Sequence, residues 1–178
     1  GTDRLQEVVQ LMGFSDDEIV VNVQGDEPLI PPAVIEQVAK NLADNAQAGV
    51  ATLAEPISCD DDFRNPNVVK VVSAANGMAM YFSRAAIPWP RDFTDNPTEA
   101  ISSKMTPLRH IGIYAYRVAE LNQFTRWSVA PVEALECLEQ LRFLWNGTAI
   151  HVAQAAEDVP AGVDTEEDLQ RVIRLVEG

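Results

Sequence analysis

The chain has 178 residues, which is the size of a single domain, and 47% of them are hydrophobic against 22% charged. That balance is typical of a globular protein and excludes disordered and collagen-like classes, and no run of about 18 apolar residues predicts a membrane span. Lys and Arg number 13 against 27 Asp and Glu, which gives a formal net charge of −14. A field of that sign repels phosphate backbones, so we expect neither nucleic acid nor a membrane as a partner. An anionic substrate would need a few placed arginines or a divalent cation.

Apolar spacing in the first third of the chain predicts alternating helices and strands. A helical stripe over residues 5–12 is followed by Gly13, which predicts that the helix ends there. The β-branched run 19–23 predicts a short buried strand, helical spacing returns over 32–45, and a second strand is predicted over 50–57. Alternation of this kind favours an α/β fold with a largely parallel sheet, whose ligands bind beyond the carboxyl ends of the strands.

The middle of the chain predicts antiparallel structure. Residues 68–73 and 78–82 have strand character and flank Asn76-Gly77, a dipeptide typical of tight β-hairpins. Residues 88–107 contain four prolines and predict a long irregular connection or arm, which we expect to be mobile.

The last third of the chain returns to the alternating pattern. A strand is predicted over 108–118, a helix opens at Pro131, a strand follows over 150–153, and an apolar stripe over 169–176 predicts a final helix. We expect one domain spanning the whole chain, with an inserted antiparallel lobe or arm over about 68–125.

Two acidic positions are candidate metal ligands. Asp26 follows the predicted strand 19–23, where a doubly wound sheet presents groups to a ligand. A carboxylate there could bind magnesium, which prefers hard oxygen ligands, or it could be a solvated turn residue. Asp164 lies just before the last predicted helix, where the helix dipole stabilises a carboxylate that needs no further function.

One face of the strand over 108–118 carries polar groups around a glycine. Leu108, His110, Gly112, Tyr114 and Tyr116 share that face because side chains alternate along a strand. A strand glycine allows close approach of a ligand, and the imidazole and phenol groups could bind a hydroxylated substrate. The alternative is a half-buried aromatic face with no ligand.

The helix that Pro131 opens carries a carboxylate near its apolar stripe. Leu135 and Leu138 are predicted to mark its core side, and Glu139 lies at the edge of that stripe. Glu139 either pairs with Arg142 or, together with Gln140, faces a polar ligand.

The other chemically distinctive side chains are two arginines and two cysteines. Arg4 and Arg84 have the fork geometry that suits carboxylates and phosphates, or they are surface charges. Cys59 and Cys137 lack metal-ligand spacing, and we expect them to be reduced thiols.

Six segments, taken together, resemble the 3-deoxy-manno-octulosonate cytidylyltransferases, the CMP-Kdo synthetase family. They are, in chain order, residues 1–5 (GTDRL), 21–28 (VNVQGDEP), 81–84 (YFSR), 110–114 (HIGIY), 138–142 (LEQLR) and 162–165 (GVDT). One segment alone would be a weak signal, whereas six in the family's order are specific.

The resemblance implies a three-layer, Rossmann-like nucleotidyltransferase fold. Its sheet would be mixed and mostly parallel, with an antiparallel lobe for dimerisation and substrate, and the family's N-terminal βα units have no counterpart here. The implied protein is a cytoplasmic, magnesium-dependent homodimer. It would join CTP and Kdo into CMP-Kdo, releasing pyrophosphate, for lipopolysaccharide biosynthesis in Gram-negative bacteria.

The resemblance also implies roles for individual side chains. Asp26 and Asp164 would be the catalytic, magnesium-binding carboxylates, and Arg4 and Gln24 would lie near the nucleotide. The residues implied to contact the sugar acid are Arg84, His110, Tyr114, Glu139 and Gln140. The reaction would be in-line attack of a Kdo hydroxyl on the α-phosphorus of CTP, with no protein general base assigned.

Two alternatives stay open at this point. The chain could be a related cytidylyltransferase for another acid sugar. It could also be a non-catalytic, dimerising fragment, because no segment matches the family's N-terminal loop that binds the nucleotide.

Overall fold

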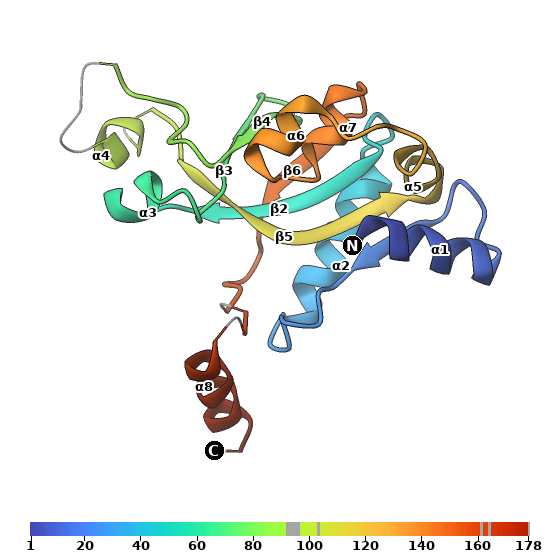
Figure 1. The fold of residues 1–178 in the computed structure, drawn as a ribbon. Helices are drawn as coiled ribbons and strands as arrows, with labels where there is room; N and C mark the ends of the chain where they lie inside the picture. The colour runs from blue at the N-terminus through green and yellow to red at the C-terminus, as the bar shows by residue number, and fades with distance from the viewer. Residues whose placement is uncertain (92–96, 103, 161, 164, 178) are drawn as a thin grey trace.

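The structure is a computed structural model that describes residues 1–91, 97–102, 104–160, 162–163 and 165–177 (Figure 1). Its strands are β1 (Ile19–Asn22), β2 (Val50–Pro56), β3 (Lys70–Ser73), β4 (Ala79–Ser83), β5 (Leu108–Arg117) and β6 (Ile150–Gln154). Its helices are α1 (Thr2–Met12), α2 (Pro32–Asp44), α3 (Asp60–Arg64), α4 (Pro97–Ser102), α5 (Val118–Phe124), α6 (Pro131–Glu136), α7 (Leu141–Trp145) and α8 (Glu166–Glu177).

Strand β5 is the centre of the sheet. It pairs antiparallel with β2 along one edge, and along the other with β3 at its start and β1 at its end. β4 pairs with β3 and β6 with β2, which gives the order β4-β3-β5-β2-β6 with β1 also on β5. The long strand therefore joins the hairpin β3–β4 to the rest of the sheet.

The mixed α/β fold predicted from the sequence is confirmed, although antiparallel pairs predominate among the described strands. β1 and β2 run in the same direction, as a strand–helix–strand unit requires, because both are antiparallel to β5. β5 lies between them, so β2 with β6 is the one parallel pair among these strands. The order of elements along the chain predicts the direction of neighbouring strands but not the insertion of a later strand between them.

Helices cover both faces of the sheet, which confirms the three layers. α2 packs on one face (Figure 1). Its residues Val34, Val38 and Leu42 are fully buried there, in the same cluster as Leu53 of β2. A second core lies on the opposite face and includes apolar side chains of β4, α5 and α7. Among its buried members are Phe82, Leu121, Phe124 and Phe143.

Local sequence signals fix several boundaries as predicted. Gly13 ends α1 in the left-handed region with φ 69°, and its N–H bonds back to the last turn of the helix. Pro32 is the first residue of α2, a position that needs no N–H donor. The Asn76-Gly77 turn joins β3 to β4, and Gly77 has a φ of 79°.

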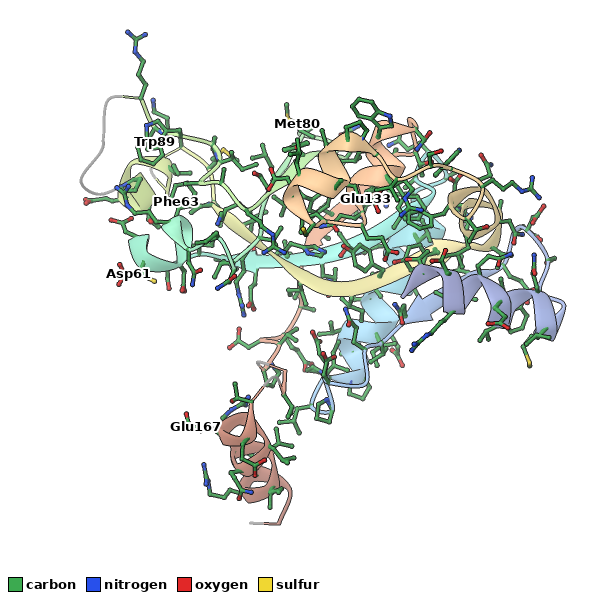
Figure 2. All side chains as sticks on the ribbon, viewed as in Figure 1. Asp61, Phe63, Met80, Trp89, Glu133 and Glu167 are labelled. Carbon is green, nitrogen blue, oxygen red and sulfur yellow. The ribbon has the colours of Figure 1, made fainter. Side chains whose placement is uncertain are left out.

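The segment 88–107, expected to be irregular, contains α4. Residues 92–96 and 103 in this segment lie outside the described part of the chain. α4 and the other short helices, α3, α5 and α7, have too few turns for apolar periodicity to predict them. In α3, for example, Phe63 is fully buried and Asp61 lies exposed at the surface (Figure 2). A helix of 5 residues is too short for this difference to repeat along the sequence.

The helix that opens at Pro131 is shorter than the sequence predicts. α6 ends at Glu136 because Cys137 takes a left-handed conformation with φ 51°. Leu135, predicted to face the core, is 84% exposed, so that prediction is wrong, whereas Leu138 is buried. The apolar spacing continues across a break in the helix, and Glu139 lies in the turn before α7.

The predicted final helix is present as α8, which projects away from the sheet with the C-terminus (Figure 1). Among the described residues, no helix is long and apolar enough to cross a bilayer. Cys59 and Cys137 are exposed free thiols, as expected. The separate lobe over 68–125 stays a prediction.

Replacing Gly77 by alanine should destabilise the fold more than the same change at Gly13. Both glycines have positive φ, a conformation that costs an L-residue about 1–2 kcal/mol. A Cβ at Gly77 would also lie 2.9 Å from Nε2 of His151 on β6, whereas a Cβ at Gly13 would meet nothing within 4 Å. Urea unfolding should show a free-energy loss about 1 kcal/mol larger for Gly77→Ala. Equal losses would contradict crowding between the hairpin turn and β6.

Candidate functional site

A cavity of about 220 Å³ opens on the face of β5 that the sequence marks as polar. Its lining residues are Thr2, Gln24, His110, Gly112, Tyr114, Tyr116, Leu138, Glu139, Gln140 and Phe143. The fold thus brings together most of the side chains predicted to contact the nucleotide or the sugar. The lining residues come from five separate places in the chain, which are Gln24, the strand β5, the α6–α7 turn, α1 and α7.

Strand β5 supplies one wall of the cavity. His110, Gly112, Tyr114 and Tyr116 share this face, as the alternation of side chains predicts. In the register with β2, Thr52 pairs with Tyr114 but the next residue, Leu53, pairs with Ile111. β5 therefore has extra residues at Gly112 and bulges there. The irregularity in the sheet therefore lies at the cavity.

His110 is a neutral hydrogen-bonding group in this wall. Burial lowers the pKa of its imidazole from 6.5 to about 3. Its Nε2 lies 3.0 Å from Oγ1 of Thr52, and that hydroxyl donates to the carbonyl oxygen of Ile113 at 2.6 Å. Because the Thr52 proton is used there, Nε2 of His110 is the donor to Thr52, and Nδ1 is left as an acceptor.

Tyr114 and Tyr116 are phenols that stay protonated. Burial raises the pKa of Tyr114 well above its usual value, and the electrostatic interactions with Tyr116 and Glu139 raise it further. Burial and Glu139 likewise raise the pKa of Tyr116. The two rings stack with centroids 5.6 Å apart. Because both pKa values are raised, both hydroxyls are neutral groups near the carboxylate of Glu139.

Glu139 faces the cavity. Its Oε2 accepts a hydrogen bond from Oγ1 of Thr2 at 2.8 Å. Arg142, which the sequence offered as its ion-pair partner, pairs instead with Glu133 of α6, with Nη2 to Oε1 at 2.5 Å. Of the two alternatives left open for Glu139, the structure supports the one in which it faces a ligand site.

Gln24 lies against the glycine of β5. A Cβ on Gly112 would be 3.4 Å from Nε2 of Gln24 and 3.8 Å from Oε1 of Glu27. A Cβ alone would make ordinary van der Waals contact with this amide, whereas a side chain that extends beyond Cβ would compete with Gln24 for the same space.

Glu139 is the one lining residue, among those the structure describes, that carries a formal charge at neutral pH. The two arginines predicted to bind substrates do not line the cavity. Arg4 is exposed on α1. Arg84 donates from Nε to the carbonyl oxygen of Glu136 at 2.6 Å and from Nη1 to that of Pro66 at 3.0 Å. Its guanidinium is therefore bound to backbone carbonyls and is not a free surface charge.

Asp26 is exposed in the loop that follows β1. Its carbonyl oxygen accepts a hydrogen bond from the N–H of Val163 at 2.7 Å, so this loop lies beside residues 162–163. Asp164, the second predicted metal ligand, lies outside the described residues. Within the described part of the chain, no group of three His, Cys, Asp or Glu side chains could hold a metal ion.

Sequence reasoning did not identify several residues that shape this site. Thr52 fixes the tautomer of His110, yet it looks like any other residue of a buried strand, and no signal could have found it. Thr2 and Leu138 belong to segments of the family resemblance, so position in those segments was the available signal. Strand alternation predicts Tyr116 on this face but gives it no individual role, and nothing in the sequence pattern indicates Phe143.

The buried state of His110 should make folding sensitive to acid. The folded pKa lies below the unfolded value, so only the unfolded chain takes up this proton between about pH 6.5 and 3, and stability falls as pH falls. The loss attributable to His110 should approach about 1.4 kcal/mol per pH unit. Urea unfolding at pH 7, 6 and 5 should show a shallower decline for His110→Gln than for the unchanged protein.

His151→Gln is the matched control, because burial lowers the pKa of His151 as well but less strongly. Its decline should lie closer to that of the unchanged protein. A His110→Gln variant as acid-sensitive as the unchanged protein would contradict the buried, neutral imidazole.

Comparisons with known proteins support the family resemblance found in the sequence. Residues 1–152 match the family model described as Cytidylyltransferase. A 3-deoxy-manno-octulosonate cytidylyltransferase of Cellvibrio japonicus is 61% identical over 99% of the chain and 70% of its own length. The protein of the same name from Pseudomonas syringae pv. syringae is 56% identical over 100% of the chain and 70% of its own length.

A solved structure gives the same result in three dimensions. It is a CMP:2-keto-3-deoxy-manno-octonic acid synthetase complexed with CTP, with a TM-score of 0.84 and 38% identity. The match covers 99% of this chain and 67% of that one. The chain therefore belongs to the 3-deoxy-manno-octulosonate cytidylyltransferase family and is a nucleotidyltransferase.

Proposed function

We propose that the protein transfers CMP from CTP to Kdo in a magnesium-dependent reaction, giving CMP-Kdo and pyrophosphate for lipopolysaccharide biosynthesis. The observation that carries this proposal is the cavity, which gathers His110, Tyr114, Glu139 and Gln140 together with Gln24 and Gly112. The names of the relatives and the CTP bound to the solved structure support the same pair of substrates.

The cavity has the chemistry expected of a site for a polyhydroxylated ligand. Nδ1 of His110 is an acceptor, the phenol of Tyr114 is a neutral donor or acceptor, and the carboxylate of Glu139 is an acceptor. Gln140 adds an amide that offers both donors and an acceptor. Such a set can bind sugar hydroxyls without a change of protonation, so we assign the sugar to this cavity.

The charges require a cation for the nucleotide. The chain has a net charge of −14 and Glu139 adds a negative charge in the cavity, while both proposed substrates are anions. Asp26 fits a magnesium site, because its carboxylate is exposed and hard oxygen ligands suit that ion. The Val163–Asp26 hydrogen bond brings the residues just before Asp164 to the same loop. We propose that both aspartates hold the ion, which would neutralise phosphate charge when bound.

The proposed chemical step is a displacement at the α-phosphorus of CTP. A bond forms from a hydroxyl oxygen of Kdo to that phosphorus, the bond to the bridging oxygen breaks, pyrophosphate leaves, and the hydroxyl proton passes to solvent. The protein residues bind and orient the sugar so that its hydroxyl is in line with the leaving group. We assign no side chain as general base.

The proposal extends to three further positions, of which Gln24 lines the cavity and Arg4 and Arg84 lie outside it. We assign Arg4 and Gln24 to the nucleotide and Arg84 to the carboxylate of the sugar acid. A cytoplasmic homodimer is the assembly that the family resemblance implies, and it is part of the same proposal.

Pyrophosphate release tests the proposed substrates directly. Protein expressed from its complete gene should release pyrophosphate from CTP when both Kdo and magnesium are present, and should lose this activity with a chelator. Other eight- and nine-carbon acid sugars, compared at a fixed CTP concentration, should react at least about tenfold less well in kcat/KM. Better turnover of another acid sugar would assign that sugar instead, and no turnover of any would overturn the proposal.

Asp26→Asn should reduce kcat about 100-fold or more while leaving the melting temperature almost unchanged, because the residue is exposed and the change removes charge from a solvent-facing site. Asp61→Asn is the matched control, since Asp61 is also an exposed carboxylate but lies on α3. Steady-state kinetics and thermal unfolding of both variants decide the point. Near-normal turnover in Asp26→Asn would exclude its proposed role.

A further inference from the structure

Leu138, Glu139 and Gln140 line the cavity from a turn that belongs to no helix or strand. Within the turn, the N–H of Leu141 donates to the carbonyl oxygen of Leu138, and that of Arg142 donates to the carbonyl oxygen of Glu139, both at 3.1 Å. These local bonds shape the turn but do not fix it against the sheet. Its place over the cavity therefore depends on contacts with other elements.

Glu136, the last residue of α6, connects this turn to the sheet. Its Oε1 accepts a hydrogen bond from the hydroxyl of Ser83 at 2.7 Å, and its Oε2 accepts one from the backbone N–H of Arg84 at 2.8 Å. Ser83 ends β4 and is 2% exposed, so the carboxylate binds to a rigid part of the fold. Both oxygens are thereby committed to the end of one strand.

The contact is reciprocal. Nε of Arg84 donates to the backbone oxygen of Glu136 at 2.6 Å, and Nη2 reaches that of Cys137 at 3.5 Å. Nearby Lys70 is fully buried, and its pKa is lowered by burial and by Arg84, while the negative charge of Glu136 works in the opposite direction. The carboxylate thus also compensates two buried or partly buried cations.

The other contacts of the turn serve different purposes. Glu133 and Arg142 join α6 to α7, with Oε2 of Glu133 accepting from Nε of Arg142 at 2.8 Å. This ion pair joins the two helices to each other and not to the sheet. The hydroxyl of Thr2 holds Glu139 from the side of α1. The carboxylate of Glu136 and the guanidinium of Arg84 together link the start of the turn to the end of β4.

We propose that Glu136 is a positioning residue for the reaction: by binding the end of β4, it holds the α6–α7 turn so that Glu139 and Gln140 face the sugar acid. This inference rests on the proposed function, because it takes the sugar acid as the ligand of the cavity. Glu136 does not line the cavity, so it acts through the turn.

The test compares Glu136→Ala with Glu136→Gln in protein expressed from its complete gene. Alanine removes both hydrogen bonds, whereas glutamine keeps an acceptor for the N–H of Arg84 and a donor for the oxygen of Ser83. For Glu136→Ala, KM for Kdo should rise about tenfold or more while KM for CTP changes less than about twofold. Glu136→Gln should recover KM for Kdo to within about threefold of the unchanged protein. Hydrogen exchange at the amides of Leu141 and Arg142 should be faster in the alanine variant alone.

Glu18→Ala is the matched control, because Glu18 also accepts from a serine hydroxyl and a backbone N–H, both of Ser15, and is exposed away from the cavity. It should leave both KM values unchanged. Equal rises in the two KM values, a loss in kcat alone, or no recovery by glutamine would overturn the inference. If Glu136→Ala fails to fold, Ser83→Ala removes one of the two bonds and should raise KM for Kdo about threefold. No activity in the unchanged protein would instead reject the proposed function, and the hydrogen-exchange comparison would still decide whether Glu136 holds the turn.

Discussion

The site depends on burying polar side chains of β5 without leaving them charged or unpaired. An unsatisfied buried polar group costs roughly 1–3 kcal/mol, so each group in this wall needs a partner or a neutral form. His110 stays neutral and bonds to Thr52, Tyr114 keeps its proton, and Glu139 accepts from Thr2. The result is a cavity whose donors and acceptors are fixed before a ligand arrives. A preformed array of this kind favours recognition by hydroxyl groups over recognition by charge.

The same arrangement explains why binding and charge neutralisation are assigned to different parts of the fold. Among the described residues that line the cavity, Glu139 carries the one charge, which would repel a carboxylate or phosphate placed against it. Asp26 lies outside that cavity, in the exposed loop that the backbone of Val163 holds. In our account neutral groups and one carboxylate bind the sugar hydroxyls, Arg84 is assigned to the carboxylate of the sugar, and the anionic nucleotide is bound where a cation can be held. Both regions belong to a chain of the cytidylyltransferase family, whose relatives share its fold.

Much of the fold and of the candidate site could be predicted from the sequence, and there are physical reasons why the rest could not. The strand face from His110 to Tyr116 and the hairpin at Asn76-Gly77 were predictable, because alternation and turn chemistry are local properties. The place of β5 between β1 and β2 was not, since strand order is set by long-range pairing. The break at Cys137 was hidden by apolar spacing that continues across it. Thr52 and Glu136 escaped notice because their importance lies in partners far away in sequence.

The most direct test of this account is a crystal structure of the protein with Kdo, CTP and magnesium, using a non-hydrolysable CTP analogue to hold the complex. We predict sugar density in the cavity on β5, with hydroxyl oxygens within about 3.2 Å of Nδ1 of His110 and of the Glu139 carboxylate. Density for the sugar at another surface, with this cavity empty, would contradict the account.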